Sequence, residues 1–426
     1  MSTIPPKLIQ IIALSLILLV SGCAQRDSGV GINAITGVPE QDFITISGTA
    51  TASAEWIPEL SNGRGNSLQV GDASDFRSFS VLRWDPAAAL PDSYVVESVR
   101  IKLTTGRIWP STSDSTIYVP DLRMIVREIP VEWDEDDLIP GTLADFESFE
   151  ILDTILIDSD PDDSVFYDLP FELWQKWVDE SLAQDAEDTV STLTSYGLLF
   201  EPANEGVLVE FLSSEGGSLG DDETGSTAPV LRMEGTRWDL DDTVYVSSAL
   251  FLEQLPDHDG YLTSSSAEPQ PGRMIVSAGY PQRELVYFPL DSLVEFTERL
   301  IARAEFRVFA DPDDPLTMVY PNTGLNFKTG SLTNSDWVNE PDSVASVTLR
   351  FVGTDAVALD ADAVLLKFDV TGIVSGWMAD PAANGGLQIQ TSGENQFLSR
   401  QIFHNHETED ESKRPQLFIW YVEPSN

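Results

Sequence analysis

Short apolar runs separated by turn residues dominate the hydrophobic pattern of the chain. The runs are rich in β-branched and aromatic residues, and clusters of Gly, Pro, Asp and Asn separate them, which is typical of β-strands. Helical periodicity is scarce, and the best candidates for helices are residues 171–182 and 290–299. The pattern therefore predicts an all-β chain built of sandwiches. The predicted strands are residues 79–84, 95–104, 122–129, 196–201, 285–288, 304–309, 346–352, 387–391 and 416–422.

The first residues of the chain have the pattern of an export signal. Lys7 precedes an apolar run over residues 8–20, and two small residues separate this run from Cys23. The run is shorter than the roughly 20 residues that a helix needs to span a bilayer. A plain signal peptide that contains a cysteine and an N-terminal membrane anchor are the alternatives.

Residues 20–23, Val-Ser-Gly-Cys, resemble the lipobox of bacterial lipoproteins, whose cysteine is diacylated and becomes the new N-terminus. Cys23 is the only cysteine, and acylation removes the reactive thiol that an exported chain would otherwise carry. The resemblance implies a lipid anchor in a membrane. Ala24, where inner-membrane lipoproteins often have Asp, implies the outer membrane. We expect a signal peptide over residues 1–22 and a lipidated tether over residues 23–47.

An internal repeat organises the rest of the chain. Landmarks in residues 48–235 recur in the same order in residues 240–423, roughly 200 residues later. The paired segments are 65–70 with 272–276, 80–85 with 285–288, 99–103 with 304–308, 133–135 with 337–340, 166–169 with 367–370, 196–199 with 385–388, and 228–232 with 414–418. The repeat predicts two tandem sandwiches over residues 48–236 and 237–426. They should meet near residues 235–242 with little linker, as a fairly rigid pair.

The repeated segments resemble the disaggregatase-related (DNRLRE) modules of extracellular bacterial and archaeal proteins. The clearest stretch is residues 368–377, Phe-Asp-Val-Thr-Gly-Ile-Val-Ser-Gly-Trp, closed by Arg-Pro-Gln-Leu-Phe-Ile-Trp-Tyr at 414–421. The resemblance covers nearly all of residues 48–423, although the first copy has Leu169-Pro170 where Val-Thr is usual, and the second lacks a clear Thr-Trp after Glu340. Such modules are similar to jelly-roll carbohydrate-binding domains, and some are implicated in binding anionic polysaccharides. The resemblance therefore implies two jelly-roll-like β-sandwiches with a binding or structural role, and no catalytic residues.

The acidic composition limits the partners of this chain. It has 70 Asp and Glu against 24 Lys and Arg, for a formal net charge of −46. Such a surface repels nucleic acid phosphates, so we expect no nucleic-acid partner. An acidic polysaccharide would need a bridging cation. The surface charge is explained either by solubility in a salty medium or by the binding of divalent cations.

Two short acidic loops are the candidates for calcium, the one cofactor that the sequence suggests. The first contains Asp158, Asp160 and Asp162, and the second contains Asp311 and Asp313. Ca²⁺ takes roughly six to eight oxygen ligands, which clustered carboxylates and loop carbonyls supply. Neither loop has EF-hand spacing, so a solvated acidic turn is the alternative for both.

Aromatic and histidine residues supply further candidates. Trp109, at the start of a loop, is the candidate for stacking on a sugar ring, with packing at the edge of the sandwich as the alternative. His404 and His406 form the only His-x-His pair, which on a strand would be a candidate site for a transition metal. The acidic residues that follow favour a solvated turn instead. Seven tryptophans lie at repeat landmarks and are expected to pack between sheets: Trp84, Trp133, Trp174, Trp177, Trp337, Trp377 and Trp420.

Three functions are compatible with these features. The leading hypothesis is a non-enzymatic, lipid-anchored envelope protein that binds extracellular polysaccharide or another envelope component. The first alternative is a polysaccharide hydrolase or lyase, for which a deep cleft with carboxylates of raised pKa would argue. The second is a structural subunit of an envelope assembly. A Gly-x-Ser-x-Gly match at residues 216–220 precedes an acidic loop rather than a helix, so it is not a nucleophile elbow.

Overall fold

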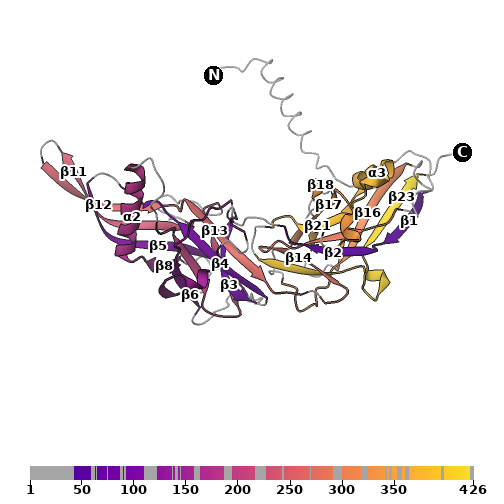
Figure 1. The fold of residues 1–426 in the computed structure, drawn as a ribbon, viewed down its shortest axis with the longest axis horizontal. Coiled ribbons are helices and arrows are strands. Elements are labelled where there is room, and N and C mark those ends of the chain that lie inside the picture. The colour runs from indigo at the N-terminus through magenta and orange to yellow at the C-terminus, as the bar shows by residue number, and fades with distance from the viewer. Residues whose placement is uncertain are drawn as a thin grey trace, which may run out of the picture.

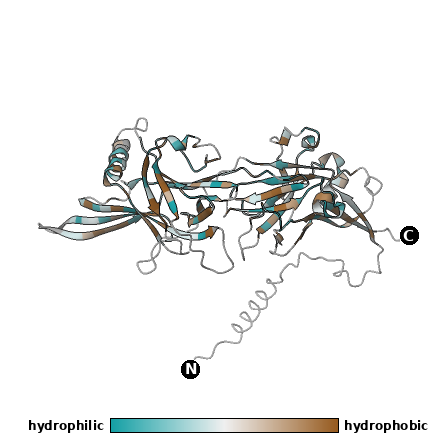
Figure 2. Ribbon diagram, turned by 90° about the horizontal axis from the view of Figure 1, so that it is seen from below, coloured by the Kyte–Doolittle hydropathy of each residue, from teal (hydrophilic) through white to brown (hydrophobic). Residues whose placement is uncertain are grey.

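Two β-sandwiches lie end to end along the long axis of the computed structural model (Figure 1). The strands are antiparallel, and Figure 2 shows hydrophobic and hydrophilic residues interspersed along the sheets. On β8 and β23 buried apolar residues alternate with more exposed ones. Each sandwich has its own apolar core, and its curled antiparallel sheets give it a jelly-roll-like form. The structure describes residues 43–422 apart from 59–62, 64, 74, 87–89, 91–92, 110–121, 137, 140–142, 144, 158–163, 187–193, 216–226, 242–243, 269, 291–299, 319–324, 341–342, 345–347, 353–356, 360–363 and 395–397.

The first sandwich is built mainly from the first half of the chain, with one helix, α2 (Phe171–Ala186), packed beside it. Its strands pair in the order β12-β11-β5-β10-β3-β4-β9-β6-β7, while β8 pairs with β5 and β13 pairs with β4. These strands are β3 (Ser67–Ala73), β4 (Phe76–Arg83), β5 (Tyr94–Trp109), β6 (Arg123–Glu128), β7 (Ile151–Leu156), β8 (Ser164–Asp168), β9 (Leu198–Pro202), β10 (Val207–Leu212), β11 (Val230–Asp241), β12 (Val244–Gln254) and β13 (His258–Ser265).

The second sandwich repeats this arrangement, with helix α3 (Thr371–Ala379) in the place of α2. Its sheets have the orders β1-β23-β16-β20 and β18-β17-β21-β15-β2, while β19 pairs with β17 and β14 with β22. The strands are β1 (Phe43–Thr49), β2 (Ala52–Trp56), β14 (Arg273–Ala278), β15 (Arg283–Tyr287), β16 (Ile301–Phe309), β17 (Leu325–Leu332), β18 (Leu349–Val352), β19 (Val357–Leu359), β20 (Leu365–Asp369), β21 (Leu387–Thr391), β22 (Ser399–His404) and β23 (Gln416–Val422).

The first two strands of each copy lie in the sandwich of the other copy. β1 pairs with β23 and β2 pairs with β15, so the N-terminal strands complete the C-terminal sandwich. In the first sandwich the equivalent places are taken by β12 on β11 and by β13 on β4. Figure 1 shows β1, in indigo, lying beside the yellow β23. The two halves of the chain are therefore tied together by an exchange of strands.

A tryptophan anchor occurs at the same place in both copies. Trp133 donates its indole N–H to the Tyr196 carbonyl at 2.8 Å, and Trp337 donates to the Gly385 carbonyl at 3.0 Å. In each copy the next residue is a glycine with positive φ, Gly197 at 103° and Gly386 at 94°. Such a backbone favours glycine, so indole and glycine form one structural unit. The internal repeat in the sequence thus corresponds to a hydrogen bond that occurs in both sandwiches.

Side chains from both sandwiches pack together where they meet. Phe76 and Leu208 of the first sandwich form one apolar cluster with Met318 and Leu398 of the second. Arg400 is fully buried beside this cluster, with its guanidinium 4.4 Å from the Phe76 ring centroid and 3.1 Å from an Asp75 oxygen. A buried arginine that bridges two units this way supports the expected rigid pair.

The predicted all-β fold of two jelly-roll-like sandwiches is confirmed, with differences at particular segments. The predicted helix at 171–182 is α2, whereas residues 291–299 of the second predicted helix lie outside the described residues. Helix α3 was not predicted, because its mainly apolar residues show no clear helical period. The expected joint at residues 235–242 falls largely within β11, and β1 begins at Phe43 within the expected tether. No helix among the described residues is long and apolar enough to cross a membrane.

Candidate functional site

The outer face of the sheet β1-β23-β16-β20 carries arginines and aromatic rings. Since alternate residues of a strand share a face, Phe418 and Trp420 of β23 point outward with Arg303, Glu305 and Arg307 of β16. The Phe418 and Trp420 ring centroids are 6.0 Å apart with the rings stacked. The Arg307 guanidinium lies 3.9 Å from the Phe418 centroid.

Glu305 holds the two arginines of this face in place. Its carboxylate accepts from Arg303 at 2.7 Å and from Arg307 at 2.5 Å. The carboxylate is almost fully buried under these groups, whereas the Arg303 side chain is 41% exposed. Because the ion pairs restrict the side chains, the face presents a preorganised layer of planar groups to solvent.

The first sandwich has a similar layer on the sheet that corresponds to this one. Arg232 of β11 lies 5.0 Å from the Phe251 centroid and 5.8 Å from that of Phe166, and Arg100 of β5 lies 5.8 Å from Phe166. Ion pairs to Glu253 and Asp168 hold these arginines at 2.5 Å and 3.0 Å. Phe166 and Phe251 are 44% and 56% exposed, which is unusual for phenylalanine. We call the two layers together the arginine–aromatic faces.

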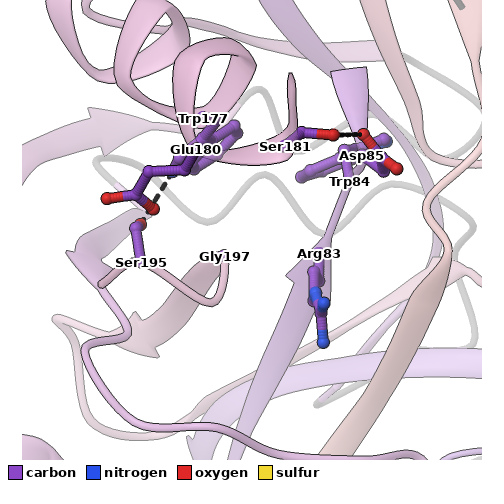
Figure 3. A pocket seen from close by; sticks show the side chains of 8 residues that line it. All are labelled: Arg83, Trp84, Asp85, Trp177, Glu180, Ser181, Ser195 and Gly197. Atoms are coloured by element: carbon purple, nitrogen blue, oxygen red, sulfur yellow. Dashed lines mark hydrogen bonds between the residues drawn. The ribbon is translucent and has the colours of Figure 1, made fainter. Parts of the chain in front are cut away.

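The hollows that the described residues line are small or shallow. One lies between the end of β4 and helix α2, where Trp84 and Trp177 stack at 6.5 Å and Trp177 donates to Ser195 at 2.7 Å (Figure 3). Its volume of about 40 Å³ is too small for a sugar ring. Another, of about 360 Å³, runs along α3 over Gly372, Gly376 and Trp377. Among the described lining residues, the first hollow has two carboxylates, Asp85 and Glu180, and the second has one, Asp380.

A group of three carboxylates lies outside these hollows, at one end of the first sandwich. Oxygens of Glu135, Glu215 and Asp259 lie within 4.8 Å of one another. Asp259, on β13, is fully buried, and its Oδ2 accepts from the Ser214 backbone N–H at 2.7 Å. Burial raises the pKa of Asp259 to about 8 although this hydrogen bond lowers it, and the negative charge of Glu215 raises the pKa further.

The structure places the sequence-predicted residues in different surroundings. Asp311 forms an ion pair with Arg273 at 2.7 Å, so it faces a cation, and Asp313 is exposed in the same turn. The other acidic loop, with Asp158, Asp160 and Asp162, lies outside the described residues, as does Cys23. The Trp109 backbone pairs with Leu208 at the end of β5, and the structure does not describe the Trp109 side chain. Calcium binding by either loop stays a prediction.

The two histidines of the His-x-His pair bind different protein groups. His404 is buried at the end of β22, and its Nδ1 lies 2.9 Å from an Arg273 nitrogen. His406 Nδ1 lies 2.8 Å from the Ser53 hydroxyl on β2. Burial, followed by the charge of Arg273, lowers the pKa of His404. These contacts give the pair a structural role, in which His406 fastens an exchanged strand.

The exposed arginine–aromatic faces were missed by the sequence reasoning. Six of the seven landmark tryptophans are buried as expected, but Trp420 lies on the outer face. The alternation of residues 416–422 could have predicted the outward position of Trp420, because Leu417, Ile419 and Tyr421 occupy the alternate, inward positions. An aromatic in register with outward residues belongs to the solvent side of a sheet.

A buried carboxyl on β15 makes stability depend on pH. Burial raises the pKa of Glu284 well above its ordinary value of 4.5, and the charge of Glu55 on the paired strand β2 raises it further. The neutral carboxyl therefore stabilises the fold fully below about pH 4.5, and this contribution is lost as the pH rises through the folded-state pKa.

We expect Glu284→Gln to remove this pH dependence. The wild-type free energy of unfolding should fall by up to about 1.4 kcal/mol per pH unit above pH 4.5, while the variant changes less, because its amide does not ionise. Urea titrations from pH 4.5 to 8 measure this. Asp313→Asn, at an exposed position, serves as the control and should follow the wild type. Parallel curves for wild type and Glu284→Gln would contradict the prediction.

Comparisons with known proteins add little to this description. No family model matches the chain, and no curated protein matches it. Among solved structures, the T=1 particles derived from infectious bursal virus align at 10% identity and a TM-score of 0.13, over 91% of this chain and 75% of that chain. The VP2 subviral particle of infectious bursal disease virus aligns at 10% identity and a TM-score of 0.13, over 91% and 79%. Alignments this weak carry no argument. The fold itself defines an all-β protein of two jelly-roll-like sandwiches.

Proposed function

We propose that this protein is a non-enzymatic, lipid-anchored envelope protein that binds an extracellular glycan through its arginine–aromatic faces. The observation that carries the proposal is the occurrence of such a layer on corresponding sheets of both sandwiches. Planar rings and guanidinium groups bind sugars by stacking and by hydrogen bonds to hydroxyl and carboxylate groups. Two such faces on one rigid body would engage a long polymer with the avidity of a bivalent binder.

The basic residues of these faces also support a glycan partner. The chain has only 24 Lys and Arg, and the sheets that carry the aromatic rings hold several of them: Arg100, Lys102, Arg232, Arg303, Arg307 and Lys367. Carboxylates neutralise the arginines, which suits a neutral or weakly charged polymer in a chain of net charge −46. The lipid on Cys23 would hold these faces at the membrane surface, an expectation that rests on the resemblance to the lipobox.

A polysaccharide array probed with residues 23–426 carrying Cys23→Ser tests the proposal, with Ca²⁺ and again with EDTA. We expect binding that Trp420→Ala weakens about tenfold, equivalent to ~1.4 kcal/mol, because the stacking surface is lost. Phe251→Ala should do the same on the first sandwich. Phe171→Ala removes an exposed ring on helix α2 and serves as the control, with unchanged binding. Absence of binding to every polysaccharide would overturn the proposal and favour a structural subunit of an envelope assembly.

A further inference from the structure

One oxygen of a buried carboxyl group, Asp259 Oδ1, points to a cation at one end of the first sandwich. Asp259 is fully buried, and its Oδ1 has no hydrogen-bond partner among the described residues. A buried polar atom without a partner is costly, and for a carboxylate oxygen the cost is larger. Three carboxyl groups converge there, with Asp259 buried, Glu135 half-buried and Glu215 exposed.

The distances fit one calcium ion. Two oxygens bound to the same Ca²⁺, each at about 2.4 Å, lie at most about 4.8 Å apart. One oxygen from each of Glu135, Glu215 and Asp259 lies within 4.8 Å of the others. Carboxylate oxygens are the ligands that hard divalent cations prefer, whereas transition metals favour imidazole and thiolate. The geometry and the ligand chemistry therefore agree on the class of ion.

The second sandwich replaces this group with a neutral contact. Strand pairing puts Ser53 of β2 in the place of Asp259, since Ser53 lies opposite Val286 as Asp259 lies opposite Leu82. The Ser53 hydroxyl lies 2.8 Å from His406 Nδ1. In both sandwiches this position fastens an exchanged strand, but only in the first do three carboxylates meet there among the described residues.

We propose that Glu135, Glu215 and Asp259 bind one Ca²⁺ ion, which clamps the exchanged strand β13 onto the first sandwich. Each ligand comes from a different segment: Glu135 from the loop after Trp133, Glu215 from the turn after β10, and Asp259 from β13. Closing such a site fixes three parts of the chain relative to one another. The clamp is separate from the arginine–aromatic faces and does not depend on their function.

Calcium titration of residues 23–426 carrying Cys23→Ser tests this clamp. In chelator-treated protein, Ca²⁺ at 100 times its dissociation constant should raise the melting midpoint of the first sandwich by about 5 °C. Calorimetric titration should detect this site. Tb³⁺, used as a luminescent probe for Ca²⁺, should be sensitised by Trp133, which is two residues from Glu135.

The variant Asp259→Asn distinguishes a cation ligand from a carboxyl group with a purely structural role. The amide keeps the size and still accepts from the Ser214 N–H, so without calcium the variant should be at least as stable as the wild type. Its calcium-induced shift and its Tb³⁺ signal should be lost. Asp311→Asn, in the acidic turn paired with Arg273, should keep both. A wild type that does not respond to calcium, or an unchanged response in Asp259→Asn, would overturn the proposal.

Discussion

Deleting residues 1–57 is expected to unfold the second sandwich and to leave the first one folded. The deletion removes β1 and β2, which pair with β23 and β15 of the second sandwich. Ala50 belongs to its main core, Ile46 packs against that core, and Trp56 packs on the cluster around Trp337. Two sheet edges and an apolar face would be exposed, and so large a loss exceeds the stability of a typical domain.

Near-ultraviolet circular dichroism and two-dimensional NMR of the 58–426 chain measure this effect. A chain that starts at residue 43 keeps both strands and serves as the control. An excess of a synthetic peptide of residues 43–57 should restore the signals of the second sandwich, as an added strand completes an open sheet edge. Native-like signals from 58–426 without the peptide would mean that β1 and β2 are dispensable.

A cysteine pair checks that the exchanged strand belongs to the same molecule. Thr49 and Gln416 lie directly opposite each other on β1 and β23. Cα atoms of such antiparallel pairs are roughly 4.5–5.5 Å apart, within the range of a disulfide. In a Cys23→Ser background, Thr49→Cys with Gln416→Cys should crosslink within one chain. Dimers joined by this bond would show that copies exchange strands with one another.

The second large effect is expected from Trp337→Ala, which should cost about 3–5 kcal/mol of unfolding free energy. Trp337 is buried among Leu285 and Leu332, meets the Tyr287 ring edge-on at 6.4 Å, and satisfies the Gly385 carbonyl. Truncation leaves a cavity and also an unpaired buried carbonyl. The loss is large because packing and hydrogen bonding depend on the same side chain.

Urea denaturation followed by circular dichroism measures this cost, with Trp420→Ala as the matched control. Trp420 lies half-buried on the outer face, so its truncation should change stability by about 1 kcal/mol or less. Equal losses for the two variants would contradict the structural roles assigned to these tryptophans. Trp133→Ala should resemble Trp337→Ala, because its indole makes the corresponding hydrogen bond to Tyr196.

The sequence predicted much of the local structure because strands follow from local chemistry. Two of the predicted strands, residues 387–391 and 416–422, coincide with β21 and β23. The buried tryptophans of the landmarks were also anticipated. Several strands were not predicted, among them β3, β10 and β17 and all four exchanged strands. The exchanged strands are β1, β2, β12 and β13. Their residues are largely small, polar or exposed, so their pairing depends on partners far away in the chain.

The candidate sites were harder to predict from the sequence than the strands. The predicted calcium loops were runs of aspartates adjacent in sequence, whereas Glu135, Glu215 and Asp259 are separated by 80 and 44 residues. No local pattern marks such a group, since almost any spacing can be found among 70 acidic residues. The arginine–aromatic faces carried a partial signal, because the period of two in each strand separates outward from inward residues. The period of two does not predict which strands lie side by side.

By itself, the sequence determined the fold class, the duplication and the pattern of inward and outward residues, because each depends on the chemistry of near neighbours. Tertiary structure alone decided which copy each terminal strand completes and which carboxylates meet. Those outcomes depend on contacts between residues such as Ser47 and Phe418, or Glu135 and Asp259, that are far apart along the chain. In the structure β1 and β2 complete the second sandwich, whereas β12 and β13 complete the first.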